Sequence, residues 1–291
     1  MKQMTEKKYD LAVAYRIYPR VSKSPPVCRD DKYTLADICL RSFKESLGIL
    51  RARIWVLLDD CPPKYKNLFT RYFDLHDLVF VSFPGSGNAA TSKAQIECLL
   101  EQNDAPYVYL AEDDYFYLPK QFEQMLRFLN AEPEAHFISP YDHPDYYLLG
   151  LHDHPVRSIV CDKKYWRQSS TTCFTFLTTR AILRKTAPMF YTLSRRNYDN
   201  SIWMSLNKYP LLKPSILFRT LFGPGHLWKS VIKAWFFEWR QICFGTRWKL
   251  WTPVPTIATH MEKSGLAPGV DWPPILKEAI AHVNDPLNRK G

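Results

Sequence analysis

The sequence lacks long hydrophobic runs and paired cysteines, and both absences narrow the class of protein. No apolar run in the 291 residues approaches the roughly 20 residues that a membrane-spanning helix needs. The first residues contain no apolar signal-peptide core and no small-residue cleavage site, so we expect a cytoplasmic protein. Seven scattered cysteines without a CxxC pair argue against a disulfide framework and against a zinc knuckle. We therefore expect a soluble or peripheral protein with free thiols.

Apolar, aromatic and basic residues are abundant. Hydrophobic residues make up 46% of the chain and aromatic residues 15%, which excludes disorder as the main state. The formal net charge of +10 favours anionic partners, such as nucleotide phosphates or acidic lipids. Nucleic acid would also be attracted, but the chain has no RNA-binding, zinc-finger or helix-turn-helix signature. No nucleic acid partner is therefore expected.

Strand-like and helix-like segments alternate along the first 120 residues. Buried strands are predicted at residues 9–15, 52–58, 78–82 and 107–112, with helices at about 34–50, after Pro63 to about 73, and at 89–101. This alternation predicts an α/β fold, with a mostly parallel, Rossmann-type sheet flanked by helices. Right-handed crossovers would bring the carboxyl ends of the strands to one edge of the sheet.

Three consecutive carboxylates, Glu112, Asp113 and Asp114, end the fourth predicted strand. Like charges this close repel one another unless a cation neutralises them. In open α/β sheets ligands bind at the carboxyl ends of strands, and Mg²⁺ or Mn²⁺ is usually held by one or two carboxylates plus substrate phosphates. We predict a divalent metal here; the alternative is an acidic turn before a helix that starts near Pro119.

Four stretches of the chain carry a resemblance to a known family. They are Trp55–Asp60, Gly87–Lys93, the acidic triplet at 112–114, which looks like a DxD variant, and His260, which follows an apolar run. Together they resemble the GT-A-fold glycosyltransferases, in particular the family 2-like enzymes. The resemblance is carried mainly by residues 9 to 120.

The resemblance implies transfer of a sugar from a nucleotide-sugar donor to a glycan or lipid-linked acceptor, with inversion at the anomeric carbon. Mn²⁺ or Mg²⁺ would neutralise the charge that grows on the leaving diphosphate. The implied metal ligands are Asp114 and His260, although a lone histidine can equally be structural. The implied nucleotide-sugar-binding residues are Tyr15, Asp59, Asp60, Lys93, Glu112 and Asp113. For Lys93, a solvated helix position is the alternative to contact with a phosphate.

An inverting transferase needs a base that takes the proton of the acceptor hydroxyl. Asp199 is the best candidate for this catalytic role, and a helix N-cap is its alternative. The implied domain layout has a catalytic domain at residues 1–225, divided into a nucleotide-sugar half (1–118) and an acceptor half (119–225). Residues 226–291 would form a C-terminal extension that contains an amphipathic helix and a metal-ligand or lid segment.

The predicted amphipathic helix, residues 227–244, is rich in tryptophan and flanked by basic residues. Apolar residues recur at helical spacing, and Trp228, Trp235 and Trp239 are expected on one face, with Lys229, Lys233 and Arg240 beside them. Such helices lie in membrane interfaces, which would place the protein peripherally on an anionic inner membrane face. The alternative is a helix packed on the catalytic domain.

Two other functions compete with sugar transfer. A sugar-phosphate nucleotidyltransferase would share the parallel sheet and the metal, but it normally carries a glycine-rich loop after the first strand, and residues 15–20 contain no glycine. A non-catalytic membrane-binding or polyanion-binding protein would explain the charge and the tryptophans but not the buried acids.

Overall fold

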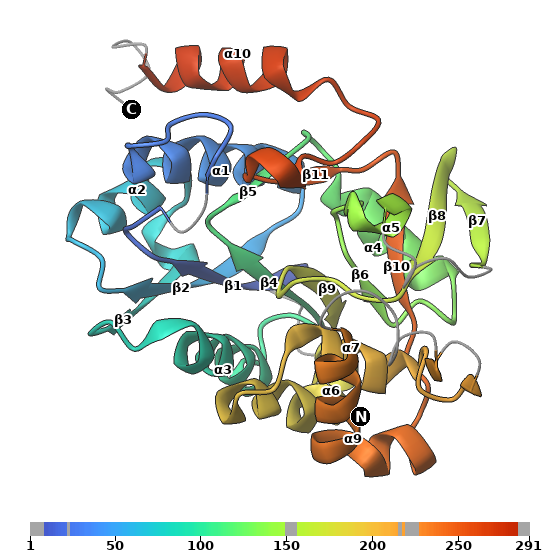
Figure 1. Ribbon diagram of the computed structural model, residues 1–291. Coiled ribbons are helices and arrows are strands. Elements are labelled where there is room, and N and C mark those ends of the chain that lie inside the picture. The colour runs from blue at the N-terminus through green and yellow to red at the C-terminus, as the bar shows by residue number, and fades with distance from the viewer. Residues whose placement is uncertain (1–8, 22–23, 149–155, 215–216, 219–226, 285–291) are drawn as a thin grey trace, which may run out of the picture.

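The computed structural model describes residues 9–21, 24–148, 156–214, 217–218 and 227–284. The chain folds around a nine-stranded sheet with helices on both faces, which confirms the expected α/β class (Figure 1). Helices α1, α2 and α10 lie over one face, and α3, α6, α7 and α9 lie over the other (Figure 1).

The strand order of the large sheet is β3-β2-β1-β4-β9-β6-β10-β8-β7, and a second sheet pairs β11 with β5. The strands are β1 (Leu11–Ile17), β2 (Ala52–Asp59), β3 (Leu78–Phe83), β4 (Tyr107–Glu112), β5 (Tyr115–Tyr117), β6 (Phe137–Ile138), β7 (Ser158–Cys161), β8 (Lys164–Ser169), β9 (Phe176–Thr179), β10 (Leu250–Val254) and β11 (Ala258–His260).

The helices are α1 (Lys32–Leu47), α2 (Lys64–Tyr72), α3 (Gly87–Glu101), α4 (Phe122–Ala131), α5 (Asp145–Leu148), α6 (Arg180–Phe190), α7 (Asp199–Asn207), α9 (Leu227–Phe244) and α10 (Trp272–Asn284). Short 3-10 helices are η1 (Leu75–Asp77), η3 (Tyr191–Arg195) and η4 (Lys263–Gly265).

The half of the sheet formed by β3, β2, β1 and β4 is parallel, as the alternating pattern predicts. Strands buried on both faces read as nearly continuous apolar runs, and β1 and β2 do so. The strand order reverses between β1 and β4, because the chain passes from β1 outward to β3 and then returns to the other side of β1. Ligand sites of open α/β sheets lie at such a reversal, outside the carboxyl ends of the strands.

Beyond β4 the sheet becomes mixed. Strand β9 is antiparallel to both β4 and β6, and β8 is antiparallel to its neighbours β10 and β7. The sequence pattern does not predict β8, because Lys164–Ser169 is largely polar. Helix α1 begins earlier than expected, at Lys32, because the Asp31 carboxylate accepts the N–H of Thr34 at 3.0 Å and thereby caps the helix.

The segment that was expected as a C-terminal extension contributes to both sheets. Strand β10 lies between β6 and β8 in the large sheet, and β11 pairs with β5 in the small one. Helix α10 contacts α1 (Figure 1). In the register of the β5–β11 pair, His260 lies opposite Tyr115, the residue that follows Asp114. This pairing brings the far end of the chain to the acidic triplet.

Helix α9 packs one face against α7 and exposes the other. Val231, Ala234 and Ile242 are buried against Met204, whereas Trp228 and Trp239 are exposed. Trp235 is half-buried against the apolar cluster, so the three tryptophans differ in their exposure to solvent. In the described residues, no helix is both long enough and apolar enough to cross a bilayer.

Candidate functional site at the carboxyl ends of β1, β2 and β4

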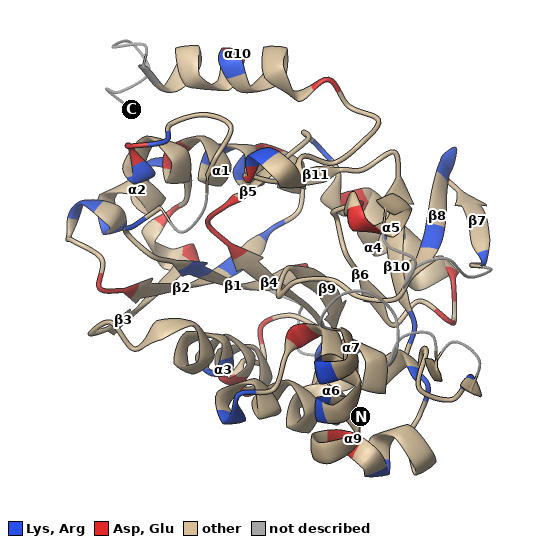
Figure 2. Cartoon of the chain, in the orientation of Figure 1, with Lys and Arg blue, Asp and Glu red and all other residues tan. Residues whose placement is uncertain are grey.

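A pocket of about 800 Å³ opens where the strand order reverses. It is lined by strand ends, by the loop before α3 and by the loop before α7, through Arg16, Tyr18, Arg20, Asp59, Asp60, Gly85, Gly87, Asn88, Thr91, Glu112, Asp113, Asp114, Cys173, Phe174, Leu193, Asn197, Tyr198, Asp199 and His260. The fold thus collects the acids of two strand ends, Asp199 and His260 at one place. Figure 2 shows the acidic residues between β4 and β5 near the centre of the molecule.

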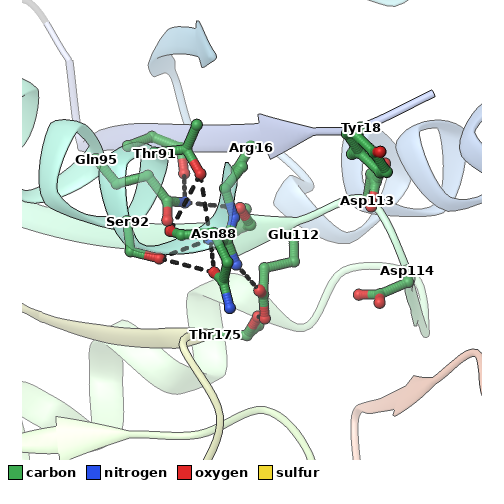
Figure 3. A network of polar contacts seen from close by, with 12 residues as sticks. Arg16, Tyr18, Asn88, Thr91, Ser92, Gln95, Glu112, Asp113, Asp114 and Thr175 are labelled. Carbon is green, nitrogen blue, oxygen red and sulfur yellow. Dashed lines mark hydrogen bonds and ion pairs between the residues drawn. The ribbon is translucent and has the colours of Figure 1, made fainter. Parts of the chain in front are cut away.

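Arg16, near the end of β1, organises one wall of the pocket. Its guanidinium donates to the side chain of Asn88, to the Ser92 hydroxyl at 2.6 Å, and to Glu112. The second Glu112 oxygen accepts the Thr175 hydroxyl at 3.0 Å. Figure 3 shows Arg16 between α3 and Glu112, with Asp114 apart from these contacts. The ion pair gives the Glu112 carboxylate a neutralising partner and fixes its position.

The same wall is tied to the sheet by Gln95 of α3. Its side-chain amide donates to the carbonyl of Ala14 in β1 at 2.8 Å and to that of Ala111 in β4 at 2.9 Å. Helix α3 therefore holds both strands that flank the reversal of strand order.

Asp113, the second acid of the triplet, points into the protein. Its Oδ2 accepts the backbone N–H of Tyr18 at 3.0 Å and lies 2.9 Å from the Lys32 ammonium. Burial raises the pKa of the Asp113 carboxyl, and the charge of Lys32 opposes that rise. Asp113 therefore joins the end of β1 to the start of α1. Its ion pair with Lys32 reduces the charge repulsion within the acidic triplet.

Asp114 faces His260. The Nε2 atom of His260 lies 3.1 Å from Oδ2 of Asp114, and its Nδ1 atom lies 3.6 Å from Glu262. The other carboxylate oxygen, Oδ1, is buried without a hydrogen-bond partner in the described part of the chain. Burial raises the pKa of Asp114, but the hydrogen bond and charge of His260, together with Lys32 and Arg16, lower it to about 2. Asp114 is therefore an anion with one oxygen free to accept a ligand.

This arrangement suits a divalent metal. A carboxylate and an imidazole from two different elements converge in a pocket, and the unpartnered Oδ1 supplies a donor atom. Two protein ligands leave coordination positions for substrate phosphates, as is usual for Mg²⁺ and Mn²⁺. A separate group of possible metal ligands lies just before the amino end of β3, whereas the pocket lies at the carboxyl ends of the strands. This group consists of Asp74, His76 and Asp77.

Asp59, at the end of β2, holds the loop that precedes α3. Its two carboxylate oxygens accept the backbone N–H groups of Ser86 and Gly87 at 2.7 and 2.9 Å. Gly87 has φ +79°, a conformation that favours glycine, although a Cβ there would meet no other atom. Asp60 is exposed at the rim with φ +56°, 3.4 Å from Arg20.

Asp199 is the first residue of α7 and lines the pocket. The N-cap residue of α7 is Tyr198, so Asp199 is not the helix cap that the sequence offered as its alternative role. Asp199 is instead an acid in the first turn of α7. Cys173 is half-buried beside the pocket, and desolvation, followed by the charges of Asp199 and Glu112, raises the pKa of its thiol to about 12. The carboxylate of Asp199 therefore acts on the same interior as the triplet.

Two residues of the sequence-based set lie outside the pocket lining. Tyr15 is fully buried in the core, edge-on to Phe43 and Phe69. Its neighbour Arg16 points the other way and reaches the pocket, because successive residues of a strand alternate between faces. Lys93 lies on the solvent side of α3, 3.3 Å from Glu97 one turn later.

Sequence reasoning missed Arg16, Lys32 and Thr175. The sequence contains a signal for Arg16 only. This arginine interrupts the apolar run Leu11–Ile17, and a charge in a buried strand requires a partner. Nothing local in the sequence connects Thr175 to Glu112 or Lys32 to Asp113. These pairings arise only from the topology.

Comparisons with known proteins give a fold-level likeness. No family model matches the chain, and no curated protein matches it. Similar solved structures include a CMP:2-keto-3-deoxy-manno-octonic acid synthetase complexed with CTP, at 11% identity and TM-score 0.43, covering 94% of this chain and 97% of that one.

Two further structures are similar to parts of this chain. A 4-diphosphocytidyl-2C-methyl-D-erythritol synthase from Anaerococcus prevotii has 9% identity and TM-score 0.42, covering 72% of this chain and 94% of that one. A mannosyltransferase from Pyrobaculum calidifontis in complex with GDP-Man and Mn²⁺ has 14% identity and TM-score 0.35, covering 50% and 39%. All three TM-scores lie below 0.5.

Proposed function

We propose that the protein is a metal-dependent glycosyltransferase, which moves a sugar from a nucleotide-sugar donor to a hydroxyl of a glycan or lipid-linked acceptor. The observation that carries the proposal is the Asp114–His260 pair, with an unpartnered carboxylate oxygen, at the reversal of strand order. Anionic Asp114 and the imidazole of His260 would hold Mn²⁺ or Mg²⁺, which when bound supplies positive charge to the leaving diphosphate.

The remaining polar residues have roles that follow from their contacts. Glu112, held by Arg16 and Thr175, presents a fixed carboxylate that can accept a hydroxyl of the ribose. Asp59 holds the loop at Gly85–Gly87 open to the pocket by binding its amides. Asp60 and Arg20 flank the mouth, where a nucleotide would enter. Asp113 balances Lys32 behind this surface.

Asp199 is proposed as the general base. It lines the pocket from the start of α7, whereas the carboxylates proposed to hold the donor come from the ends of β2 and β4. A carboxylate there takes the proton of the attacking hydroxyl. Inversion at the anomeric carbon follows from a single attack of this kind.

One observation favours a second candidate, a sugar-phosphate nucleotidyltransferase. Arg16 is the last residue but one of β1, Arg20 follows that strand, and both line the pocket, so basic groups lie where a nucleoside triphosphate would need them. Such an enzyme would join a sugar phosphate to the nucleotide and release pyrophosphate. A non-catalytic polyanion-binding protein would not need the pocket acids.

The test uses the full chain with Mn²⁺ and a panel of sugar nucleotides. A ligand that binds the native state raises the melting temperature, so thermal shifts would select the donor class. Release of nucleoside diphosphate from that donor, lost in Asp114→Asn, supports sugar transfer. Pyrophosphate release from a nucleoside triphosphate and a sugar phosphate would support the second candidate, and absence of any metal-dependent nucleotide binding would contradict both.

A further inference from the structure

Helix α9, which is kinked at Glu238, presents a stripe of exposed apolar side chains away from its contact with α7. The stripe consists of Trp228, Ile232, Phe236, Trp239 and Phe244, with Phe236 75% and Phe244 81% exposed. The opposite face of the same helix is buried by Val231, Ala234 and Ile242. Packing on the domain therefore accounts for the buried apolar residues of α9 and leaves the stripe without an explanation in the described fold.

The charges beside the stripe are almost all positive. Lys229 and Arg240 lie next to the rings of Trp228 and Trp239, at 5.6 and 5.4 Å from the ring centres. Lys233 lies between them on the helix and donates to the backbone carbonyl of Arg196. Figure 2 shows a single red, acidic segment on α9. The one acid of this helix is Glu238, and its side chain is buried.

We propose that the α9 stripe docks on the surface of an anionic lipid bilayer. Aromatic rings with adjacent lysine and arginine are suited to the boundary between headgroups and acyl chains, where the rings enter the apolar region and the cations meet phosphates. The positive charge of α9 favours a lipid surface over a second copy of the chain as the partner of the stripe. A second copy would place the cations of its own α9 against Lys229 and Arg240, whereas an anionic surface neutralises these cations.

The stripe is connected to the pocket through Lys233. Its ammonium lies 3.5 Å from the ring centre of Tyr198, and Tyr198 lines the pocket beside Asp199. A docked α9 therefore lies next to the acceptor side of the pocket. One consequence rests on the proposed function: an acceptor carried by a membrane lipid would enter from this side.

Vesicle binding by the full chain tests the docking surface without any assay of activity. Binding to vesicles of phosphatidylcholine with phosphatidylglycerol should exceed binding to phosphatidylcholine alone and should fall with added salt. The double variant Phe236→Ser/Trp239→Ser should bind roughly tenfold or more weakly, at an unchanged melting temperature, because exposed rings add little to the fold. Ile49→Ser is the matched control, since Ile49 is 84% exposed in the turn before β2, away from α9.

A second variant series keeps the test decisive if the apolar substitutions disturb folding. Lys229→Gln and Arg240→Gln should weaken binding to anionic vesicles by roughly fivefold for each cation removed and flatten the salt dependence. Cys243, the exposed cysteine of α9, offers a site for a polarity-sensitive dye whose emission should shift to the blue on docking.

Three results would overturn the proposal. They are absence of vesicle binding by the wild-type protein, wild-type binding by Phe236→Ser/Trp239→Ser, and a dimer that this double variant dissociates while no vesicle binding is seen. The last result would assign the stripe to a second copy of the chain. Vesicle binding without sugar transfer would retain the docking surface and reject the proposed function.

Discussion

The Nε2 atom of His260 lies 3.1 Å from Oδ2 of Asp114, although the two residues are 146 positions apart in the chain. Three pairs of residues between β5 and β11 produce this contact, together with a hydrogen bond of 2.7 Å from the Met261 amide to the Asp114 carbonyl. The acid and the imidazole are therefore positioned by backbone pairing as well as by their own attraction. A pair held in this way suits a ligand site, because binding then costs little conformational entropy of the two side chains.

Asp114→Asn should keep the fold and remove metal-dependent donor binding, because the amide preserves the shape of the side chain and deletes its charge. Calorimetry with Mn²⁺ and the donors selected by thermal shift is the measurement. Asp74→Asn, just before the amino end of β3, is the matched control and should bind as the wild type does. Unchanged affinity in Asp114→Asn would reject Asp114 as a ligand.

Asp199→Asn should leave donor binding intact and lower turnover by roughly 10² to 10⁴-fold, the usual effect of losing a general base. Steady-state kinetics with saturating donor measures this change, and calorimetry verifies donor binding in the same variant. Turnover within a few-fold of the wild type would leave Asp199 as a first-turn acid that stabilises α7 through the helix dipole.

Arg16→Met should destabilise the protein by roughly 3–5 kcal/mol, because it leaves the Glu112 carboxylate without its cation in a largely buried site. Adding Glu112→Gln to Arg16→Met should recover a large part of that loss, since the unpaired charge is then removed. Urea denaturation of the wild type, both single variants and the double variant gives the coupling free energy. If the changes in unfolding free energy of the two single variants add up to that of the double variant, Arg16 and Glu112 do not act as a coupled pair.

Glu238 should make stability depend on pH between about 4.5 and 7. Burial, opposed by hydrogen bonds from Ser205, Thr192 and Asn197, raises the pKa of its carboxyl to about 7. Because the folded state holds this proton more tightly than the unfolded state, the stabilisation is complete below about pH 4.5 and is lost as the pH rises to 7. From the shift, the loss is roughly 3 kcal/mol.

Denaturation of the wild type and Glu238→Gln across this pH range isolates the contribution. The amide cannot lose a proton, so the free energy of unfolding of the variant should decline less than that of the wild type. Parallel curves would show that Glu238 titrates alike in both states. The same experiment probes the loop before α7, because Thr192 and Asn197 both donate to Glu238 and Asn197 lines the pocket.

Local sequence patterns predict much of the nucleotide half of the fold. The apolar runs of β1 to β4 and the helices between them follow from periodicity, since parallel strands buried on both faces must be apolar along their length. The acids at the ends of β2 and β4 were recognisable because charge directly after a buried strand requires an explanation. Strand β8 escaped detection because its sequence is mostly polar.

The sequence by itself determined the α/β class, the edge of the sheet at which ligands would bind, and the acids that gather there. Only the tertiary structure decided what each acid contacts: Arg16 with Glu112, Lys32 with Asp113, His260 with Asp114, and the amides of Ser86 and Gly87 with Asp59. It also turned Tyr15 into the core and Trp239 toward solvent. The reason is physical: periodicity records whether a face is buried, whereas the partner of a buried charge depends on which distant strands pair.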